Sequence, residues 1–190
     1  MKKNILFVLL LASIFYSCKK GDNHLPDGLF AKIETNKGTI FLELDYKETP
    51  ITVANFITLA EGKNDFVANR NFRGSPFYDG LKFHRVVKGF IIQAGDPIGK
   101  GTGDAGFKYS DNSKGCIFDK AGLVAMANSG PGTNSSQFFI TQMASPWLDN
   151  NFTIFGHVYD DGMEIVNNIE QFDVIKKITI IRNGELAKKI

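Results

Sequence analysis

The sequence predicts a mainly β fold, in which about eight short strands form a mostly antiparallel barrel and two helices close its ends. Three observations support this prediction. Short apolar segments recur from residue 29 to the C-terminus, with turn residues between them. Only two segments are expected to be helical. The chain of 190 residues most naturally makes one domain and is long enough for a proper core.

The first three elements follow from local patterns. Leu29–Thr35 and Thr39–Leu44 largely alternate apolar and polar residues, and Asn36-Lys37-Gly38 between them favours a hairpin. Pro50 then opens a helix, because proline suits the first helical position and the apolar residues that follow have helical spacing. Gly62 ends that helix.

The remaining elements are shorter. Residues 63–79 are polar and aromatic with no clean period, which predicts a loop. A second helix is expected near Met163–Glu170. The further strands are expected at Phe83–Val87, Phe90–Ala94, Gly122–Ala127, Gln137–Gln142, Thr153–Tyr159 and Val174–Arg182.

Residues 1–17 have the pattern of a signal peptide. Lys2 and Lys3 precede an apolar run from Ile5 to Tyr16, which is too short to span a bilayer comfortably. Ser17-Cys18 then resembles the lipobox of bacterial lipoproteins, although Phe15 stands where leucine is usual. In that class the Cys18 thiol receives a diacylglyceryl group and cleavage falls before it.

The lipoprotein interpretation predicts a domain tethered to a lipid bilayer through acylated Cys18. Residues 18–28 would hold the lipidated cysteine and a flexible polar tether, and residues 29–190 would form the folded domain. The location would be the bacterial cell envelope, with the domain in the periplasm or at the surface. Lys19 favours the outer membrane if enterobacterial sorting applies. The alternatives are a plain secreted or membrane-tethered form and a Cys18–Cys116 disulfide.

The charge balance argues against nucleic acid as a partner. The chain has 22 basic and 20 acidic residues. Removal of Lys2 and Lys3 with the leader leaves equal numbers of both, so the mature protein is formally neutral. The three histidines lack ligand spacing and there is no CxxC, so neither a metal nor a cofactor is expected.

Two blocks of sequence carry most of the functional signal. They are Phe83–Asp96, FHRVVKGFIIQAGD, and Met126–Ile140, MANSGPGTNSSQFFI. They set one arginine and several amides among phenylalanines, which suits gripping a proline ring against an apolar floor. Both blocks closely resemble the signature of the cyclophilin family of peptidyl-prolyl cis–trans isomerases. The resemblance covers nearly all of residues 29–181 and implies a closed eight-stranded antiparallel β-barrel capped by two α-helices.

The reaction of that family needs no covalent step. An X–Pro bond has little cis/trans preference but a barrier of about 18–20 kcal/mol to rotation. Twisting the bond leaves a lone pair on the proline nitrogen, so a donor aimed there stabilises the twisted state. The resemblance assigns this catalytic role to Arg85, whose charged guanidinium offers several N–H groups in one plane. A surface arginine in a salt bridge is the alternative.

The resemblance also implies the residues that bind substrate. Gln93 and Asn128 would bond the substrate backbone, Ala127 would lend its own backbone, and Gln137 would support the arginine. The apolar pocket for the proline ring would come from Phe90, Ile91, Phe139 and Leu148.

Four further positions border this expected pocket. Gly101 and Thr102 belong to a glycine turn beside the groove that takes residues preceding proline. Trp147 would help to shape a surface for cyclosporin-like ligands. Phe152 stands at the rim, where the family often has histidine, so substrate preference is expected to differ. Strand alternation turns His84 to the face opposite Arg85.

The sequence thus predicts a peptidyl-prolyl isomerase that acts on proline-containing segments of exported proteins. The protein is expected to be a monomer. Two other classes stay open. One is a binding module that holds proline-containing segments in the same groove, and the other is a structural envelope protein that makes contacts through the loop at residues 64–76.

Overall fold

The computed structural model describes residues 25–190, which form eight strands, two α-helices and two short 3-10 helices. The α-helices are α1 (Pro50–Ala60) and α2 (Gly162–Asn168), and the 3-10 helices are η2 (Pro146–Leu148) and η3 (Ala187–Lys189). The strands are β1 (Gly28–Thr35), β2 (Thr39–Leu44), β3 (Arg85–Val87), β4 (Ile91–Ala94), β5 (Leu123–Met126), β6 (Phe138–Thr141), β7 (Ile154–Tyr159) and β8 (Ile175–Asn183).

All eight strands belong to one antiparallel sheet of order β3-β4-β6-β5-β7-β2-β1-β8. Within residues 25–190 the edge strands β3 and β8 do not pair with each other. An isolated bridge instead joins Lys82 to Val174, just before these strands. Beside it, the Phe83 N–H donates to the Asp173 carbonyl at 2.9 Å. The eight antiparallel strands and two α-helices are confirmed, whereas closure as a complete barrel stays a prediction.

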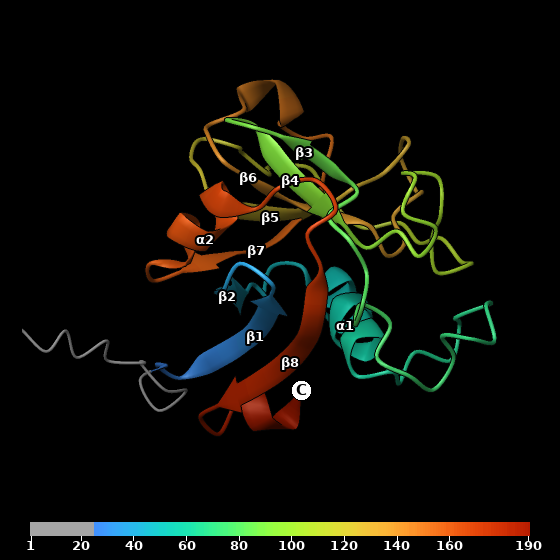
Figure 1. Ribbon diagram of the computed structural model, residues 1–190. Coiled ribbons are helices and arrows are strands. Elements are labelled where there is room, and N and C mark those ends of the chain that lie inside the picture. Colours follow the sequence, from blue (N-terminus) through green and yellow to red (C-terminus); the bar gives the residue numbers. More distant parts are fainter. Residues whose placement is uncertain (1–24) are drawn as a thin grey trace, which may run out of the picture.

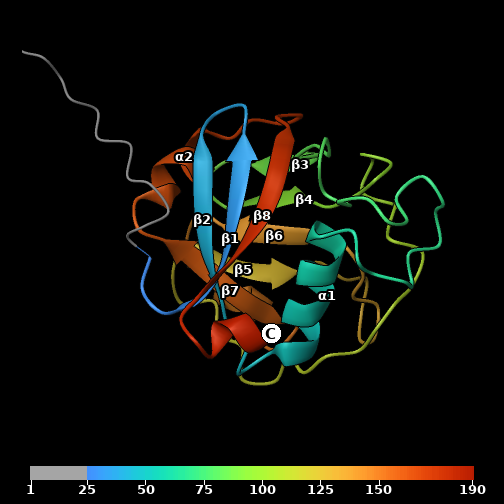
Figure 2. The same cartoon turned by 90° about the horizontal axis from the view of Figure 1, so that it is seen from below.

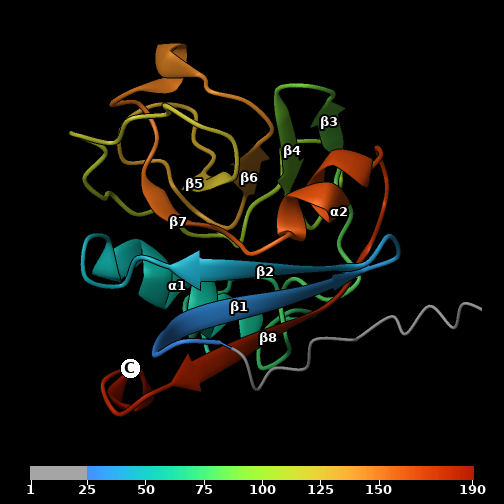
Figure 3. The same ribbon diagram turned by 90° about the vertical axis from the view of Figure 1, so that its left-hand side faces the viewer.

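The sheet curls so that its two halves face each other across the core. Figure 2 shows β2, β1 and β8 crossing over β4, β6, β5 and β7, and Figure 3 shows the same two layers from the side. Helix α1 packs against β8, while α2 packs against β2 and β7 (Figure 1). Crossed layers of this kind enclose a core between their inner faces.

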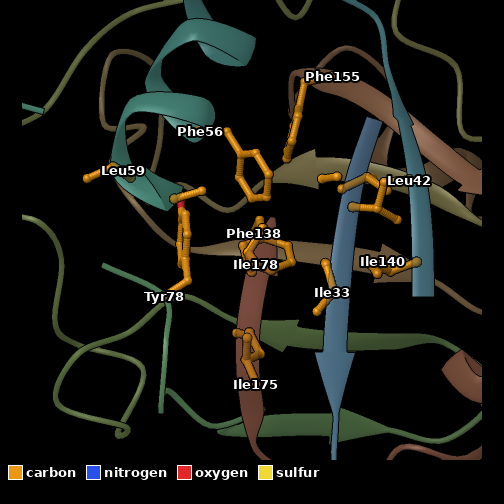
Figure 4. Packing of buried hydrophobic residues seen from close by; sticks show 14 of the residues in the cluster. Ile33, Leu42, Phe56, Leu59, Tyr78, Phe138, Ile140, Phe155, Ile175 and Ile178 are labelled. Atoms are coloured by element: carbon orange, nitrogen blue, oxygen red, sulfur yellow. The ribbon is translucent and has the colours of Figure 1, made fainter. Parts of the chain in front are cut away.

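The core between the layers is built largely from aromatic rings. Phe56 of α1 contacts Tyr78, Phe138 and Phe155, with ring centroids between 5.1 and 5.5 Å apart (Figure 4). The Tyr78 hydroxyl donates to the Ser136 carbonyl at 3.2 Å, so its polar atom is satisfied inside the core. Aliphatic residues of β1, β2 and β8 complete the packing. These contacts hold the strands that carry the candidate site.

Helix α1 begins and ends as the sequence predicts. Pro50 occupies its first turn, and Gly62 follows its end with a positive φ of 70°. A Cβ at Gly62 would lie 2.5 Å from the Ser75 carbonyl carbon, so the chain needs glycine there. Helix α2 ends two residues before the predicted Glu170. Ile169 leaves the helix in an extended conformation and is fully buried, so packing decides that boundary.

The predicted signal peptide at residues 1–17, the lipidated Cys18 and the first part of the tether lie outside the described residues. Residues 28–189 contain all the helices, strands and core contacts given above. Across residues 25–190, no helix combines the length and the apolar content that crossing a membrane would require.

Candidate active site

Four adjacent strands place the candidate site on the face of the sheet opposite the core. In the strand register Arg85 lies beside Gln93, Gln93 beside Phe139, and Phe139 beside Ala125. Successive residues of a strand point to opposite faces. Phe138 therefore points into the core, and Phe139 points to the site face, as the sequence predicts.

A cavity of about 280 Å³ opens on this face. Ile91 and Phe139 form its buried floor, at 4% and 3% exposed. The Phe139 ring is stacked on Phe118, with ring centroids 6.0 Å apart. It also makes an edge-to-face contact with Phe152, with ring centroids 5.4 Å apart. The structure brings nine of the predicted residues together around this cavity: Arg85, Phe90, Ile91, Gln93, Ala127, Asn128, Phe139, Leu148 and Phe152. An apolar ring fits such a floor, with a cation at its edge.

A chain of side-chain hydrogen bonds links Arg85 to the glycine turn. The Arg85 guanidinium donates to Gln93 Oε1 at 3.4 Å, and Gln93 Nε2 donates to Gln137 Oε1 at 2.9 Å. Gln137 Nε2 then donates to the carbonyls of Gly103, at 2.7 Å, and Gly101, at 3.2 Å. Gln137 thus reaches the arginine through Gln93.

The glycine turn is built on the buried carboxylate of Asp96. Its oxygens accept the backbone N–H groups of Ile98, Lys100 and Gly101. Burial alone would raise the pKa of Asp96, but these donors outweigh it and hold that pKa below its usual value. A Cβ at Gly103 would collide with Asp96, so glycine is required at that position. The turn is therefore anchored by a fixed negative charge.

His84 lies behind this wall and not in the cavity. Its side chain is buried, with the residue 6% exposed, whereas Arg85 is exposed. Neither imidazole nitrogen has a hydrogen-bond partner within residues 25–190. Burial lowers the pKa of His84, Asp96 opposes that shift and the Arg85 cation adds to it. The neutral imidazole is thus favoured, and the expectation that His84 faces away from Arg85 is confirmed.

A second cavity, of about 370 Å³, continues from the first. The two share Gln93, Ala127 and Asn128, and the second also contains Gly101, Thr102 and Gln137. The sequence did not single out six of its lining residues, of which three lie between the two blocks and three lie within the second block. These additional residues are Gly103, Asp104, Lys108, Ser129, Thr133 and Ser135. A polypeptide that crosses the first cavity can therefore extend into the second.

Two predicted residues make contacts in the structure that the sequence did not indicate. Trp147 does not line the first cavity but packs outside it on Phe90, with ring centroids 5.6 Å apart, and is 59% exposed. The Asn128 side chain lines both cavities, yet its amide is already engaged. It donates to the Asn151 carbonyl at 3.0 Å and accepts the Gly130 N–H at 3.1 Å. A substrate would have to exchange these bonds.

Cys116 lies near the site as a free, half-buried thiol. Its sulfur accepts the Ile154 N–H at 3.4 Å, so the thiol is packed against β7. Cys18, its possible disulfide partner, lies outside the described residues. In the described part of the chain, no group of three or more acidic, histidine or cysteine side chains is arranged to hold a metal ion.

The sequence matches one protein-family model over residues 30–185, described as "Cyclophilin type peptidyl-prolyl cis-trans isomerase/CLD". A curated relative from Mycobacterium tuberculosis, "Peptidyl-prolyl cis-trans isomerase A", is 50% identical over 134 residues, which cover 68% of this chain and 73% of the relative. "Peptidyl-prolyl cis-trans isomerase B" from Streptomyces anulatus is 43% identical, with 76% and 85% covered.

The fold matches solved structures of the same family. A crystal structure of a cyclophilin-type peptidyl-prolyl cis-trans isomerase from Cryptosporidium parvum has a TM-score of 0.68 and 31% identity, and covers 82% of this chain and 98% of its own. A second crystal structure of that protein, in the presence of the dipeptide Ala-Pro, also has a TM-score of 0.68, with 30% identity and 81% and 99% covered.

Proposed function

The chain belongs to the family of cyclophilin-type peptidyl-prolyl cis–trans isomerases, and we propose that it catalyses X–Pro rotation by non-covalent stabilisation of the twisted amide in the cavity lined by Arg85. The proline ring would rest on Ile91 and Phe139. The Arg85 guanidinium would donate to the proline nitrogen as its lone pair appears. The observation that carries this proposal is that a fixed cation and an apolar floor line the same cavity.

The hydrogen-bond chain supports the role of Arg85. Gln93 accepts one guanidinium N–H, which leaves other N–H groups of the same plane for the substrate. Gln137 holds Gln93 in turn and is itself fixed to the glycine turn. The donor is thus oriented before substrate arrives, and preorganised donors of this kind are worth about 3 kcal/mol in a transition state.

The test is cis/trans exchange on an Ala-Pro peptide with wild-type protein, Arg85→Ala and Arg85→Lys. We expect kcat/KM to fall about 100-fold in Arg85→Ala, because one transition-state donor is lost. Arg85→Lys keeps the charge but loses the planar set of donors, so it should recover only part of the activity. Peptide binding by folded wild-type protein without acceleration would refute catalysis and leave the binding module.

We also propose that the enzyme works on exported proteins while anchored to the bacterial envelope, with the outer membrane as the favoured location. The support is the sequence alone: an apolar leader followed by Ser17-Cys18 and a polar tether. Several acyl chains on Cys18 would give a stable anchor, at about 0.8 kcal/mol per buried methylene. A domain held there would act where newly exported chains fold, a process in which proline isomerisation takes tens of seconds.

Metabolic labelling with a radioactive fatty acid tests this anchor. Wild-type protein should carry label and sediment with membranes, whereas Cys18→Ser should lose both properties. Cys116→Ser is the matched control, because it removes the other cysteine and should keep the label. Labelled Cys18→Ser protein would refute the anchor at that residue, and unlabelled wild-type protein would favour the secreted form.

Two further properties belong to the same proposal. The exposed Trp147, which packs on Phe90, would offer an apolar contact surface to a cyclosporin-like ligand. Phe152 at the rim would alter the affinity of that ligand for the site. The second property is the monomeric state that the sequence predicts. Inhibition titrations and sedimentation of the purified protein measure these two properties.

A further inference from the structure

A third cavity, of about 390 Å³, lies between α1 and two loops outside the site described above. The loops are the one that follows α1 and the one that precedes β5, and Figures 1 and 2 place both on the α1 side of the domain. Most of the lining is apolar, and Lys108 is the only charged residue that lines it. Such a lining suits an uncharged, apolar occupant.

One wall is a single face of α1. Ile51, Ala54, Asn55 and Thr58 line the cavity, and their spacing of three or four residues puts them on the same side of the helix. Ile51 is 57% exposed although it is a large aliphatic side chain. The opposite face of α1 holds Phe56 in the core. This helix therefore has an apolar surface on its solvent side as well.

The other wall is a pair of phenylalanines from different loops. Phe66 follows α1 and Phe107 precedes β5, with ring centroids 6.0 Å apart. Phe66 is 76% exposed, the largest exposed fraction among the large hydrophobic residues of the described chain. Exposed aromatic side chains gathered around a cavity are typical of binding surfaces.

The polar side chains at the base of this cavity are hydrogen-bonded to one another. Asn64 Nδ2 donates to Thr58 Oγ1 at 3.0 Å, and the Tyr109 hydroxyl donates to Thr52 Oγ1 at 3.3 Å. Burial raises the pKa of Tyr109 to about 12, so the phenol stays neutral at physiological pH. An apolar occupant would therefore leave no floor group without a partner.

The third cavity adjoins the second one, because Lys108 lines both. Asn55 Nδ2 donates to the Ser135 carbonyl at 2.8 Å, and Ser135 lines the second cavity. The Tyr109 N–H donates to the neighbouring Asn134 carbonyl at 2.9 Å. One segment, Asn134–Ser135, thus supports the walls of both cavities, and the third cavity lies on the side of the second one that adjoins Lys108.

We propose that this third cavity is a subsite for an apolar or aromatic side chain of the polypeptide substrate, several residues before the proline. This subsite rests on the proposed function, because the substrate must run from the first cavity over the glycine turn to reach it. Phe66, Phe107 and Ile51 would contact that side chain, and Lys108 would lie beside the backbone that connects the subsites. The enzyme would then prefer proline segments preceded by a large apolar residue.

The test compares peptides on the full-length protein. Each peptide has one Ala-Pro bond, and a single phenylalanine is moved through successive positions before the proline, with serine in its place as reference. We expect one position at which phenylalanine lowers KM about fivefold and leaves kcat nearly unchanged, because the contact is equal in ground and transition states. Phe66→Ser and Phe107→Ser should abolish that preference and leave a short Ala-Pro peptide unaffected.

Leu186→Ser is the matched control, because Leu186 is also exposed, at 66%, but lines none of the three cavities proposed for the substrate. It should keep the preference. If no position shows a preference while the short peptide is isomerised normally, the subsite is refuted and the isomerase stands. If the short peptide is not isomerised but phenylalanine still strengthens binding, the proposed function fails and the subsite stands. A preference that survives Phe66→Ser, with self-association lost instead, would assign the surface to a second copy and overturn the proposal.

Discussion

Phe138 and Phe139 are neighbours on β6, but they belong to different parts of the molecule. Phe138 is fully buried between the two layers, where its ring meets Phe56 and Tyr78 edge-on. Phe139 is 3% exposed and forms the floor of the candidate active site. Burial alone does not separate these rings. The difference is that the first ring is enclosed by other side chains, whereas the second borders an open cavity.

The comparison extends to the two hydrophobic clusters that these rings join. The larger cluster contains residues from both layers and from α1, so it holds the sheet halves together. The smaller one lies on the other face of β4, β5 and β6 and has Ile91, Phe118 and Phe139 among its buried members. We expect changes in the first cluster to act mainly on stability and changes in the second to act mainly on substrate.

The largest effect is expected for Phe138→Ala. Removing a fully enclosed ring leaves a cavity, so the free energy of unfolding should fall by about 3–5 kcal/mol. The activity of the molecules that stay folded should change little, because Phe138 does not line the site. Denaturant unfolding and kcat/KM measured on the same preparation check both parts. If Phe138→Ala lost activity but kept its stability, Phe138 would belong with the site residues and not with the structural core.

A smaller loss of stability and a clear loss of activity are expected for Phe139→Ala. The ring supports the proline and contacts Phe118 and Phe152, so kcat/KM should fall about tenfold as the floor collapses. Stability should fall by about 1–2 kcal/mol, less than for Phe138→Ala, because water can reach the vacated space from the open cavity. Phe139→Leu, which keeps an apolar floor, is the control and should retain most of the activity.

Gln137→Leu should have a smaller effect that separates positioning from packing. It removes the acceptor for Gln93 and the donor to the Gly101 and Gly103 carbonyls. Arg85 would then be less well oriented, and kcat should fall about three- to fivefold with KM nearly constant. Gln137→Glu is informative as a partner variant, because it keeps the acceptor and loses the donor. Equal changes in both variants would point to the glycine turn rather than to the arginine.

The sequence predicted the elements well where local chemistry decides them, and less well where packing does. Pro50 and Gly62 bound α1 through their own backbone preferences, and both were identified. Ile169 ends α2 because its side chain enters the core, which no local pattern of residues 163–170 indicates. Phe83 was expected in a strand with Arg85. It bonds instead to the segment before β8, a partner far along the chain.

The same division holds for the site. The two blocks contain seven of the nine residues around the first cavity, and the other two, Leu148 and Phe152, follow shortly after the second block. The route from Arg85 through Gln93 to Gln137 was not predicted, since it depends on which amide lies opposite which on adjacent strands. Phe66 and Phe107 were missed as well. They are distant in sequence, lie in loops without a periodic pattern, and meet only in the folded chain.

The smallest expected effect is a pH dependence of stability from His84, which lies next to Arg85 but on the side facing away from the cavity. Burial lowers the pKa of His84 in the folded protein, so the folded state favours the neutral imidazole more than the unfolded chain does. Its contribution to stability is therefore complete above the unfolded pKa of about 6.5. It is lost as the pH falls from there through the folded pKa, where the buried ring takes up a proton beside the Arg85 cation. Unfolding curves of wild type and His84→Asn between neutral and mildly acidic pH measure this contribution, because the two proteins differ only at this histidine. If the free energy of unfolding of the wild type rises with pH no more steeply than that of His84→Asn, then His84 behaves in titration like an exposed residue although it is buried.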